Sequence, residues 1–201
     1  CIGAPRLIEA LMADEPRPTA VIVGEPTLMA PVVAQKGITN LRTTVSGREA
    51  HSSQVDQGVS AIHAAARLVS KIEDIMAELT AEGRVDEAFN VAHSSLHVGR
   101  IQGGTAINIT ARECQFDWEI RHLPQDGFDS VFARFDAYAR RLEAELRERA
   151  PQVSIRTEHL TDTVPALADR DNAAALTLCR ELLGEHDSEA VAYATEAGQF
   201  Q

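Results

Sequence analysis

The segment Glu113–Arg121 (ECQFDWEIR) alternates apolar and polar side chains more clearly than any other part of the chain. One face of the extended segment carries the apolar residues Cys114, Phe116, Trp118 and Ile120, and the other face carries charged or amide side chains. This pattern is typical of an antiparallel sheet covered on one side only, because a strand buried on both faces is apolar at nearly every position. The segment therefore predicts a sheet with one packed face and one open face.

Three further segments have strand character, namely Ile38–Gly47, Ser94–Gly104 and Gln152–Arg156. Two segments between them, 61–79 and 131–146, repeat apolar residues at helical spacing. The resulting order, strand–helix–strand–strand–helix–strand, is the ferredoxin-like split arrangement. We therefore predict an α+β fold in which a four-stranded antiparallel sheet carries two helices on one face.

The two ends of the chain have a different texture, which is typical of an α/β domain. Thr19–Val23 (TAVIV) is a short apolar run that predicts a strand buried on both faces of a parallel sheet, ended by GEPT. Near the other end, Asp171 or Asn172 can cap a helix that closes at Gly184. We expect residues 36–160 to be a small domain inserted between two pieces, 1–35 and 161–201, of an α/β domain.

The composition excludes several classes of function. The formal net charge is −11, from 30 acidic and 19 basic residues, and no basic cluster with interleaved aromatics occurs, so we expect no nucleic-acid partner. The longest uncharged run has 12 residues, well below the roughly 20 that a membrane helix needs, so we expect no membrane partner. Three cysteines without a CxxC pair indicate reduced thiols and a cytoplasmic protein. The chain starts at Cys1 instead of a methionine, so we expect a piece of a longer protein.

Two residues next to glycines are candidates for a site, although each has a simpler interpretation. Glu25 follows the TAVIV run, where it is either a solvated turn carboxylate or an oxygen ligand for a metal such as zinc. His51 lies in SGREAHSSQVDQG, where it either helps a helix to start or offers an imidazole N–H to a carbonyl or an oxyanion. Local sequence favours the simpler interpretation of both residues.

Two more candidates lie further along the chain. Asn108, in GGTAINIT, is either a turn residue or an amide that donates to a carboxylate or carbonyl oxygen. Arg121 is either solvated or paired with a neighbouring glutamate, or it clamps a substrate carboxylate through two hydrogen bonds. No GxSxG, P-loop or GxGxxG motif is present, so neither a nucleophile elbow nor a nucleotide site is indicated.

The order of the motifs resembles the acetylornithine deacetylase / succinyl-diaminopimelate desuccinylase / aminoacylase superfamily of di-zinc hydrolases. The resemblance covers essentially the whole chain, is greatest to the acetylornithine deacetylase branch, and is carried by GEPT, KG, SGREAHSS…GVSAI, GGTAINI, ECQFDWEIRHLP and TEAGQF. It implies an α/β catalytic domain with two divalent metal ions, zinc or cobalt, interrupted by a ferredoxin-like lid that forms a homodimer interface. The implied reaction is the release of acetate and ornithine from N2-acetyl-L-ornithine, a step in arginine synthesis.

The resemblance also assigns roles to individual residues. It implies that Glu25 ligates one metal and that His51 stabilises the tetrahedral oxyanion, typically in the active site of the other subunit. It places Asn108 and Arg121 on residues that bind the amino-acid end of the N-acyl amino acid, Arg121 through its carboxylate. It places Thr195 to Gly198, within TEAG, on the rim of the pocket, where Thr195 and Gly198 are expected to bind substrate.

The chain departs from the family pattern in ways that limit these expectations. Val55 and Ala111 stand where the family usually has proline, which we expect to loosen two loops slightly. The HxD motif and the Glu-Glu pair that supply other metal ligands and the general base do not occur. A two-metal site cannot be assembled from Glu25 alone, so we expect the 201-residue chain to be inactive by itself.

Two alternatives to this function remain open. The first stays in the superfamily, with succinyl-diaminopimelate, another N-acyl amino acid or a dipeptide as the substrate. The second is a stand-alone ferredoxin-like dimerisation or binding module without catalytic activity. The GEPT segment argues against the second, because such a module has no need of the end of a catalytic-domain strand.

Overall fold

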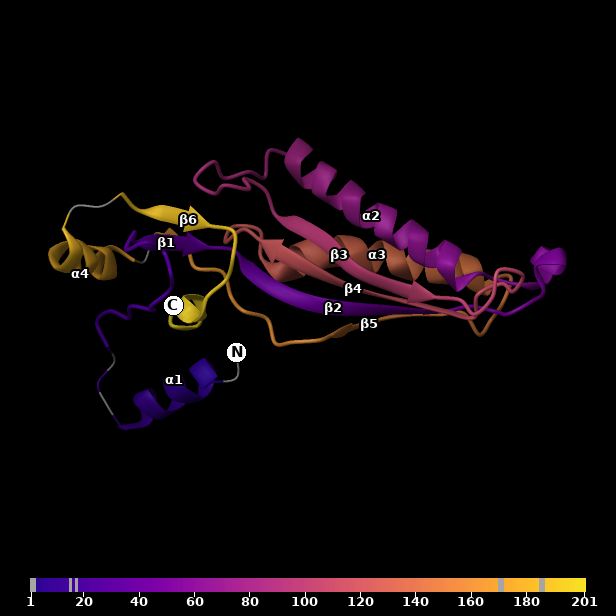
Figure 1. Cartoon of the computed structure of the whole chain (residues 1–201), viewed down its shortest axis with the longest axis horizontal. Coiled ribbons are helices and arrows are strands. Elements are labelled where there is room, and N and C mark those ends of the chain that lie inside the picture. Colours follow the sequence, from indigo (N-terminus) through magenta and orange to yellow (C-terminus); the bar gives the residue numbers. More distant parts are fainter. Residues whose placement is uncertain (1–2, 15, 17, 170–171, 185–186) are drawn as a thin grey trace.

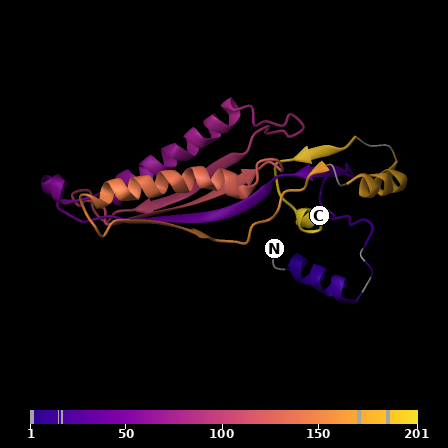
Figure 2. The same cartoon turned by 180° about the vertical axis from the view of Figure 1, so that it is seen from behind.

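The computed structural model describes residues 3–14, 16, 18–169, 172–184 and 187–201. It is elongated, with a four-stranded antiparallel sheet and two long helices at one end and a two-stranded parallel sheet at the other (Figure 1). The view from behind shows the same two parts, with the long helix Phe128–Arg147 in front of the larger sheet (Figure 2). No helix within the described ranges is long and apolar enough to cross a membrane.

The large sheet has the strand order β3-β4-β2-β5, and every neighbouring pair is antiparallel. The four strands are β2 (Gly37–Ser46), β3 (Ser95–Gly103), β4 (Glu113–His122) and β5 (Ser154–His159). The helices α2 (Ala61–Ala81) and α3 (Phe128–Arg147) follow the first and third of these strands. This connectivity confirms the predicted ferredoxin-like arrangement.

Both helices pack on the same face of the large sheet. Buried apolar side chains alternate along β4 with less buried polar ones, as the sequence predicts, and the apolar ones lie in one cluster with those of α2 and α3. The ring of Trp118 packs against that of Phe135 of α3, with the centroids 4.4 Å apart and the planes tilted by 46°, and its indole N–H donates to Thr43 Oγ1 at 3.0 Å. Small residues at the start of α2, Ala61, Ala64 and Ala65, let this helix approach the sheet closely.

Ion pairs on the outer side of α3 differ in part from the i,i+4 spacing. That spacing predicts the pairs Glu143–Arg147 and Arg141–Glu145, and the first is present at 3.2 Å. Glu145 instead accepts two hydrogen bonds from Arg67 of α2, at 2.7 and 2.8 Å. Arg141 lies over the ring of Tyr138 at 5.2 Å. The contact across the two helices offers Arg67 a bidentate geometry, which favours it over the pair within one helix.

The small sheet contains β1 (Val32–Gln35) and β6 (Glu189–Val191), which run parallel. Near it lie α1 (Gly3–Asp14) and α4 (Ala173–Leu183), and the last described turn is η3 (Glu196–Gln199). The strand predicted over residues 19–23 is wrong for this structure. None of the described strands pairs with these residues, and Val21 and Ile22 are 37% and 52% exposed, so their backbone lacks the partner that a strand needs.

The helix predicted to end at Gly184 is present as α4. Asn172 precedes it, but its side chain donates to the carbonyl oxygens of Val33 at 2.5 Å and Ala168 at 2.8 Å instead of capping the helix. Gly184 ends the helix with a positive φ of 86°. The alternative cap, Asp171, lies outside the described residues.

A single residue, Lys36, separates β1 from β2, so the two sheets are joined almost directly. Further backbone hydrogen bonds tie the junction together, from Gln35 to Leu167 at 3.1 Å and from Lys36 to Val191 at 3.2 Å. The side chains of Gln35 and Lys36 are both completely buried there. This junction orients the small sheet relative to the large one.

Candidate functional site

The six candidate residues fall into two groups at opposite ends of the large sheet. His51 and Asn108 lie beyond the end of β2 that is far from the small sheet, next to the turn η1 (Ser52–Gln57) at the right end of Figure 1. The other group, Glu25, Arg121 and the Thr195–Gly198 loop, lies at the end where the two sheets join. Because β2 has ten residues, the groups are separated by about 33 Å of strand.

His51 caps η1, and this contact determines the tautomer of its neutral imidazole ring. Its Nδ1 accepts a hydrogen bond from the backbone N–H of Ser53 at 3.2 Å and lies 2.8 Å from Ser53 Oγ. A nitrogen that accepts from a backbone amide carries no proton, so the neutral imidazole holds its proton on Nε2. The side chain is exposed, and Nε2–H is therefore available as a donor.

Asn108 is brought beside His51 by pairing between two loops. The backbone N–H of Ser52 donates to the carbonyl of Asn108 at 2.9 Å, and that of Thr110 donates to Ala50 at 2.8 Å. Asn108 itself is exposed. The two motifs are 57 residues apart in the sequence, and only the antiparallel order of the strands places them together.

Arg121 is the last residue but one of β4 and lies on the open face of the sheet. Its Nε and Nη2 donate to the two carboxylate oxygens of Glu119 at 2.7 and 3.3 Å, and Nη1 donates to the carbonyl of Ala192 at 3.3 Å. Within the described part of the chain, these contacts use three of the five guanidinium N–H groups and leave two. The simpler interpretation of Arg121, pairing with a neighbouring glutamate, describes its local contacts, and two donors remain for a carboxylate.

Lys36 adds a second positive charge at this end of the sheet. Its ammonium donates to the carbonyl of His93 at 2.5 Å. Burial, followed by the nearby charge of Arg121, lowers the pKa of Lys36 to about 8. Asp126, whose side chain is fully buried, opposes these positive charges, but Arg84 already pairs with it at 2.7 Å.

Thr195 is held by Gln35, a residue that belongs to none of the sequence motifs. Gln35 Oε1 accepts from the backbone N–H and the hydroxyl of Thr195 at 2.9 and 2.6 Å, and Gln35 Nε2 donates to the Thr195 carbonyl at 2.9 Å. The Thr195 hydroxyl in turn accepts from Ala197 N–H at 3.0 Å and caps η3. The only signal for this role is a polar residue that ends the apolar run PVVAQ.

Gly198 lies against the carbonyl of Pro165. A Cβ atom at this position would stand 2.1 Å from Pro165 O, so no other residue fits without moving the backbone. The loop that contains Thr195 and Gly198 is therefore fixed from both sides, by Gln35 and by the Pro165 backbone. Gly198 is buried, so any contact it makes with a ligand is through its backbone.

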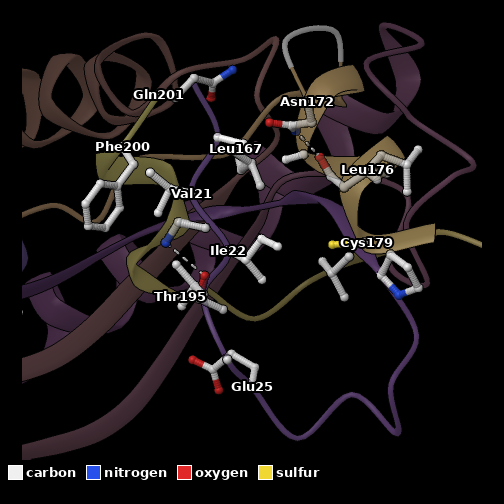
Figure 3. A pocket seen from close by; sticks show the side chains of 18 of the residues that line it. Val21, Ile22, Glu25, Leu167, Asn172, Leu176, Cys179, Thr195, Phe200 and Gln201 are labelled. Carbon is white, nitrogen blue, oxygen red and sulfur yellow. Dashed lines mark hydrogen bonds between the residues drawn. The ribbon is translucent and has the colours of Figure 1, made fainter. Parts of the chain in front are cut away.

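Glu25 and Thr195 both line a cleft of about 850 Å³ beside the small sheet (Figure 3). The walls come from α1, residues 18–33, α4 and residues 193–201, and most of the labelled side chains on them are apolar, among them Ile22 and Cys179. Glu25 is exposed, and its carbonyl accepts from Thr27 N–H at 2.8 Å. His51, Asn108 and Arg121 are absent from the described lining of this cleft.

The described residues do not form a metal site. They contain no group of three or more histidine, cysteine, aspartate or glutamate side chains close enough to hold an ion. A two-metal site needs several such ligands around a bridging water, and Glu25 contributes one carboxylate. The residues described here therefore do not fit a pair of bound metals.

Known proteins resemble this chain in sequence and in fold. The peptidase dimerisation domain of the M20 type matches residues 33–147. Acetylornithine deacetylase of Myxococcus xanthus is 33% identical over 98% of the chain and 50% of its own length, and that of Pasteurella multocida is 28% identical over 92% of the chain and 47% of its own length. The chain thus spans about half the length of the curated relatives that it matches.

Solved structures agree with the fold. A tripeptidase from Staphylococcus aureus superposes with a TM-score of 0.65 at 21% identity, over 98% of this chain and 48% of the tripeptidase. The aminopeptidase PepT from Bacillus cereus gives a TM-score of 0.61 at 20% identity, over 84% of this chain and 42% of its own. At these identities the likeness concerns the fold alone.

Proposed function

Because the chain belongs to the M20 family through its peptidase dimerisation domain, we propose that it is part of an amidohydrolase that releases acetate and ornithine from N2-acetyl-L-ornithine. The substrate is proposed from the acetylornithine deacetylases that match most of the chain. The structural observation that carries the proposal is the state of His51, whose Nδ1 is occupied by Ser53 and whose Nε2–H is exposed. This is the arrangement that a donor to a developing oxyanion requires.

The proposed reaction assigns a separate task to each polar group of this chain. Addition of water to the acetyl carbonyl places negative charge on its oxygen, to which Nε2–H of His51 donates. The amide of Asn108 donates to the amino-acid end of the substrate. The two N–H groups of Arg121 that remain free bind the α-carboxylate of the substrate. The C–N bond then breaks, and the departing nitrogen takes a proton.

The separation of the two groups supports a homodimer as the active form. One copy holds His51 and Glu25 at opposite ends of a strand about 33 Å long, which is too far for both to touch one substrate. A second copy in the opposite direction would bring its His51 to the Glu25 end of the first. Exposed apolar residues near the far end, with Ile101 and Ile107 53% and 105% exposed, are available for such a contact.

Two divalent metal ions, zinc or cobalt, belong to the proposal for the longer protein. Glu25 is the proposed ligand from this chain, and the described residues form no group of three or more ligand side chains that could hold an ion. The activation of water is therefore left to residues outside the described part of the chain. We propose in addition the domain division 1–35, 36–160 and 161–201 and a cytoplasmic location, which suits the free thiols of Cys114 and Cys179.

The experiment is to compare rates of the full-length protein that contains this sequence on three substrates. We expect hydrolysis of N2-acetyl-L-ornithine to exceed that of N-succinyl-diaminopimelate and of a dipeptide in kcat/KM. The 201-residue chain is the matched control, and we expect it to be inactive and to bind zinc weakly. A preference for either of the other substrates would reject the proposed reaction, and zinc-dependent deacetylation by the 201-residue chain would reject the proposed incomplete site.

A further inference from the structure

Glu119 and Arg121 form an ion pair on the open face of the large sheet, and this ion pair does not hold two strands of the sheet together. The two residues are separated by two positions in one strand, so their contact joins no second strand to β4. By contrast, Asp117 of the same strand pairs with Arg42 of β2 at 2.7 and 2.9 Å, and that contact does connect two strands. The contact with Glu119 therefore orients the Arg121 side chain and does not link β4 to a neighbouring strand.

The ion pair with Glu119 determines the orientation of the Arg121 guanidinium. Glu119 occupies Nε and Nη2, and the Ala192 carbonyl occupies one N–H of Nη1. The two free N–H groups are one on Nη1 and one on Nη2, which is the number that a second carboxylate needs for a bidentate contact. Both side chains are partly exposed, at 30% for Arg121 and 26% for Glu119, so a ligand can reach this edge.

The charges around Arg121 make this orientation dependent on Glu119. Lys36 lies close enough for the charge of Arg121 to lower its pKa, so the two cations repel each other. Asp126 is neutralised by Arg84, which leaves Glu119 as the carboxylate in contact with Arg121 among the described residues. Two cations and one carboxylate leave one positive charge, which one substrate carboxylate would balance.

We propose that Glu119 is a positioning residue that holds the Arg121 guanidinium so that its free edge binds the carboxylate of the substrate. This inference rests on the proposed function, because Arg121 is there the group that binds the amino-acid end. Glu119 acts through Arg121 and does not itself contact the substrate. Its loss is therefore expected to affect binding of the carboxylate and not the chemical step.

The test uses the full-length enzyme with N2-acetyl-L-ornithine and with the same compound carrying a carboxamide in place of the α-carboxylate. We expect Glu119→Gln to raise KM for the carboxylate about tenfold, with kcat within about twofold, since a lost charge-assisted contact reduces binding by that order. KM for the carboxamide should stay within about twofold. Asp117→Asn is the matched control, because it removes an equivalent carboxylate two positions away, and we expect both substrates to be unaffected by it.

Dissociation constants of the two compounds, measured by calorimetry, separate this inference from the proposed reaction. If the wild type does not hydrolyse N2-acetyl-L-ornithine, the proposed reaction is rejected. The inference is still supported in that case if the wild type binds the carboxylate compound more tightly than the carboxamide and Glu119→Gln abolishes this difference. Equal effects of Glu119→Gln on carboxylate and carboxamide, or no effect on either, would overturn it. A wild type that binds both compounds equally well would overturn it too.

Discussion

At the scale of single residues, the structural and the functional interpretation of His51 coincide. The ring caps η1 by accepting from Ser53 N–H, which is the role that a histidine at a helix start would have without any catalytic task. Because Nδ1 accepts in this contact, the proton of the neutral ring is on Nε2, and the exposed side chain offers Nε2–H as a donor. The cap therefore prepares the state of the ring that an oxyanion donor needs.

We expect His51→Ala in the full-length enzyme to lower kcat about 100-fold or more, because removal of one oxyanion donor costs on that order. The melting temperature should hardly change, since His51 is exposed and the Ser53 amide that it caps can bond to water. Steady-state kinetics and a thermal melt check both expectations. The control is His63→Ala, an exposed histidine on α2, and an unchanged kcat for His51→Ala would leave the ring with its structural role only.

Lys36 gives a second prediction at this scale, in the pH dependence of folding. Its pKa is lowered from 10.5 to about 8, so between these values the unfolded chain binds the proton and the folded chain does not. The free energy of unfolding therefore rises with pH in this window, by about 1–3 kcal/mol, and below it the buried charge destabilises the fold.

Urea unfolding of wild type and Lys36→Met at several pH values isolates this contribution, because the methionine does not titrate. We expect the stability of the wild type relative to the variant to increase from about pH 8 to about pH 10. A constant difference between the two proteins across this window would show that the ammonium is not desolvated in the folded chain.

At the scale of elements, the sequence predicted the helices and strands whose apolar residues recur at a regular spacing. It did not predict an element that depends on contacts with residues far away in the chain. The alternation in β4 and the helical stripe in α2 each extend over many residues, and the structure has both elements. The sequence did not predict β1, whose last residue, Gln35, is polar, as is Lys36 after it, yet both are fully buried. Carbonyls of Thr195 and His93 satisfy them, and these groups lie 160 and 57 residues away in the chain.

The candidate site shows the same division. The residue types and their motifs were visible in the sequence, but the bonds that orient them were not. Gln35 holds Thr195 across the junction, and Ser52 pairs with Asn108 across two loops. Conversely, residues 19–23 have the composition of a buried strand, but pairing decides whether a strand forms, and no described strand pairs with them.

The helix stripe of α2 permits a direct test of the core. Leu68 is fully buried between the helices and the sheet, whereas Ile62 of the same helix is 40% exposed. We expect Leu68→Ala to lower the free energy of unfolding by about 2–5 kcal/mol, because it leaves a cavity in a packed cluster. Ile62→Ala is the control, with an expected cost of about 1 kcal/mol or less, and equal costs in urea unfolding would contradict the packing described here.

At the scale of the whole molecule, the distance between the two ends determines how an active site can be built. His51 and Asn108 lie at one end of the large sheet, and Glu25, Arg121 and Thr195 lie at the other. No rotation of a side chain spans a strand of about 33 Å, so the proposed reaction needs residues of two chains at each site. In a dimer with two-fold symmetry, each chain would complete the site of its partner, because the same contact occurs twice.

Hybrid dimers of the full-length enzyme test this arrangement. In a dimer of one His51→Ala chain and one Glu25→Ala chain, the first chain keeps its own Glu25 and receives His51 from the second, so one of the two sites is intact. Random mixing makes half of the dimers hybrid, and we expect about a quarter of the wild-type activity, although each variant alone is nearly inactive. If His51 acted within its own chain, every site in the mixture would lack one of the two residues. Mixed subunits that stay as inactive as the separate variants, after exchange is verified by mass spectrometry, would therefore reject the shared site.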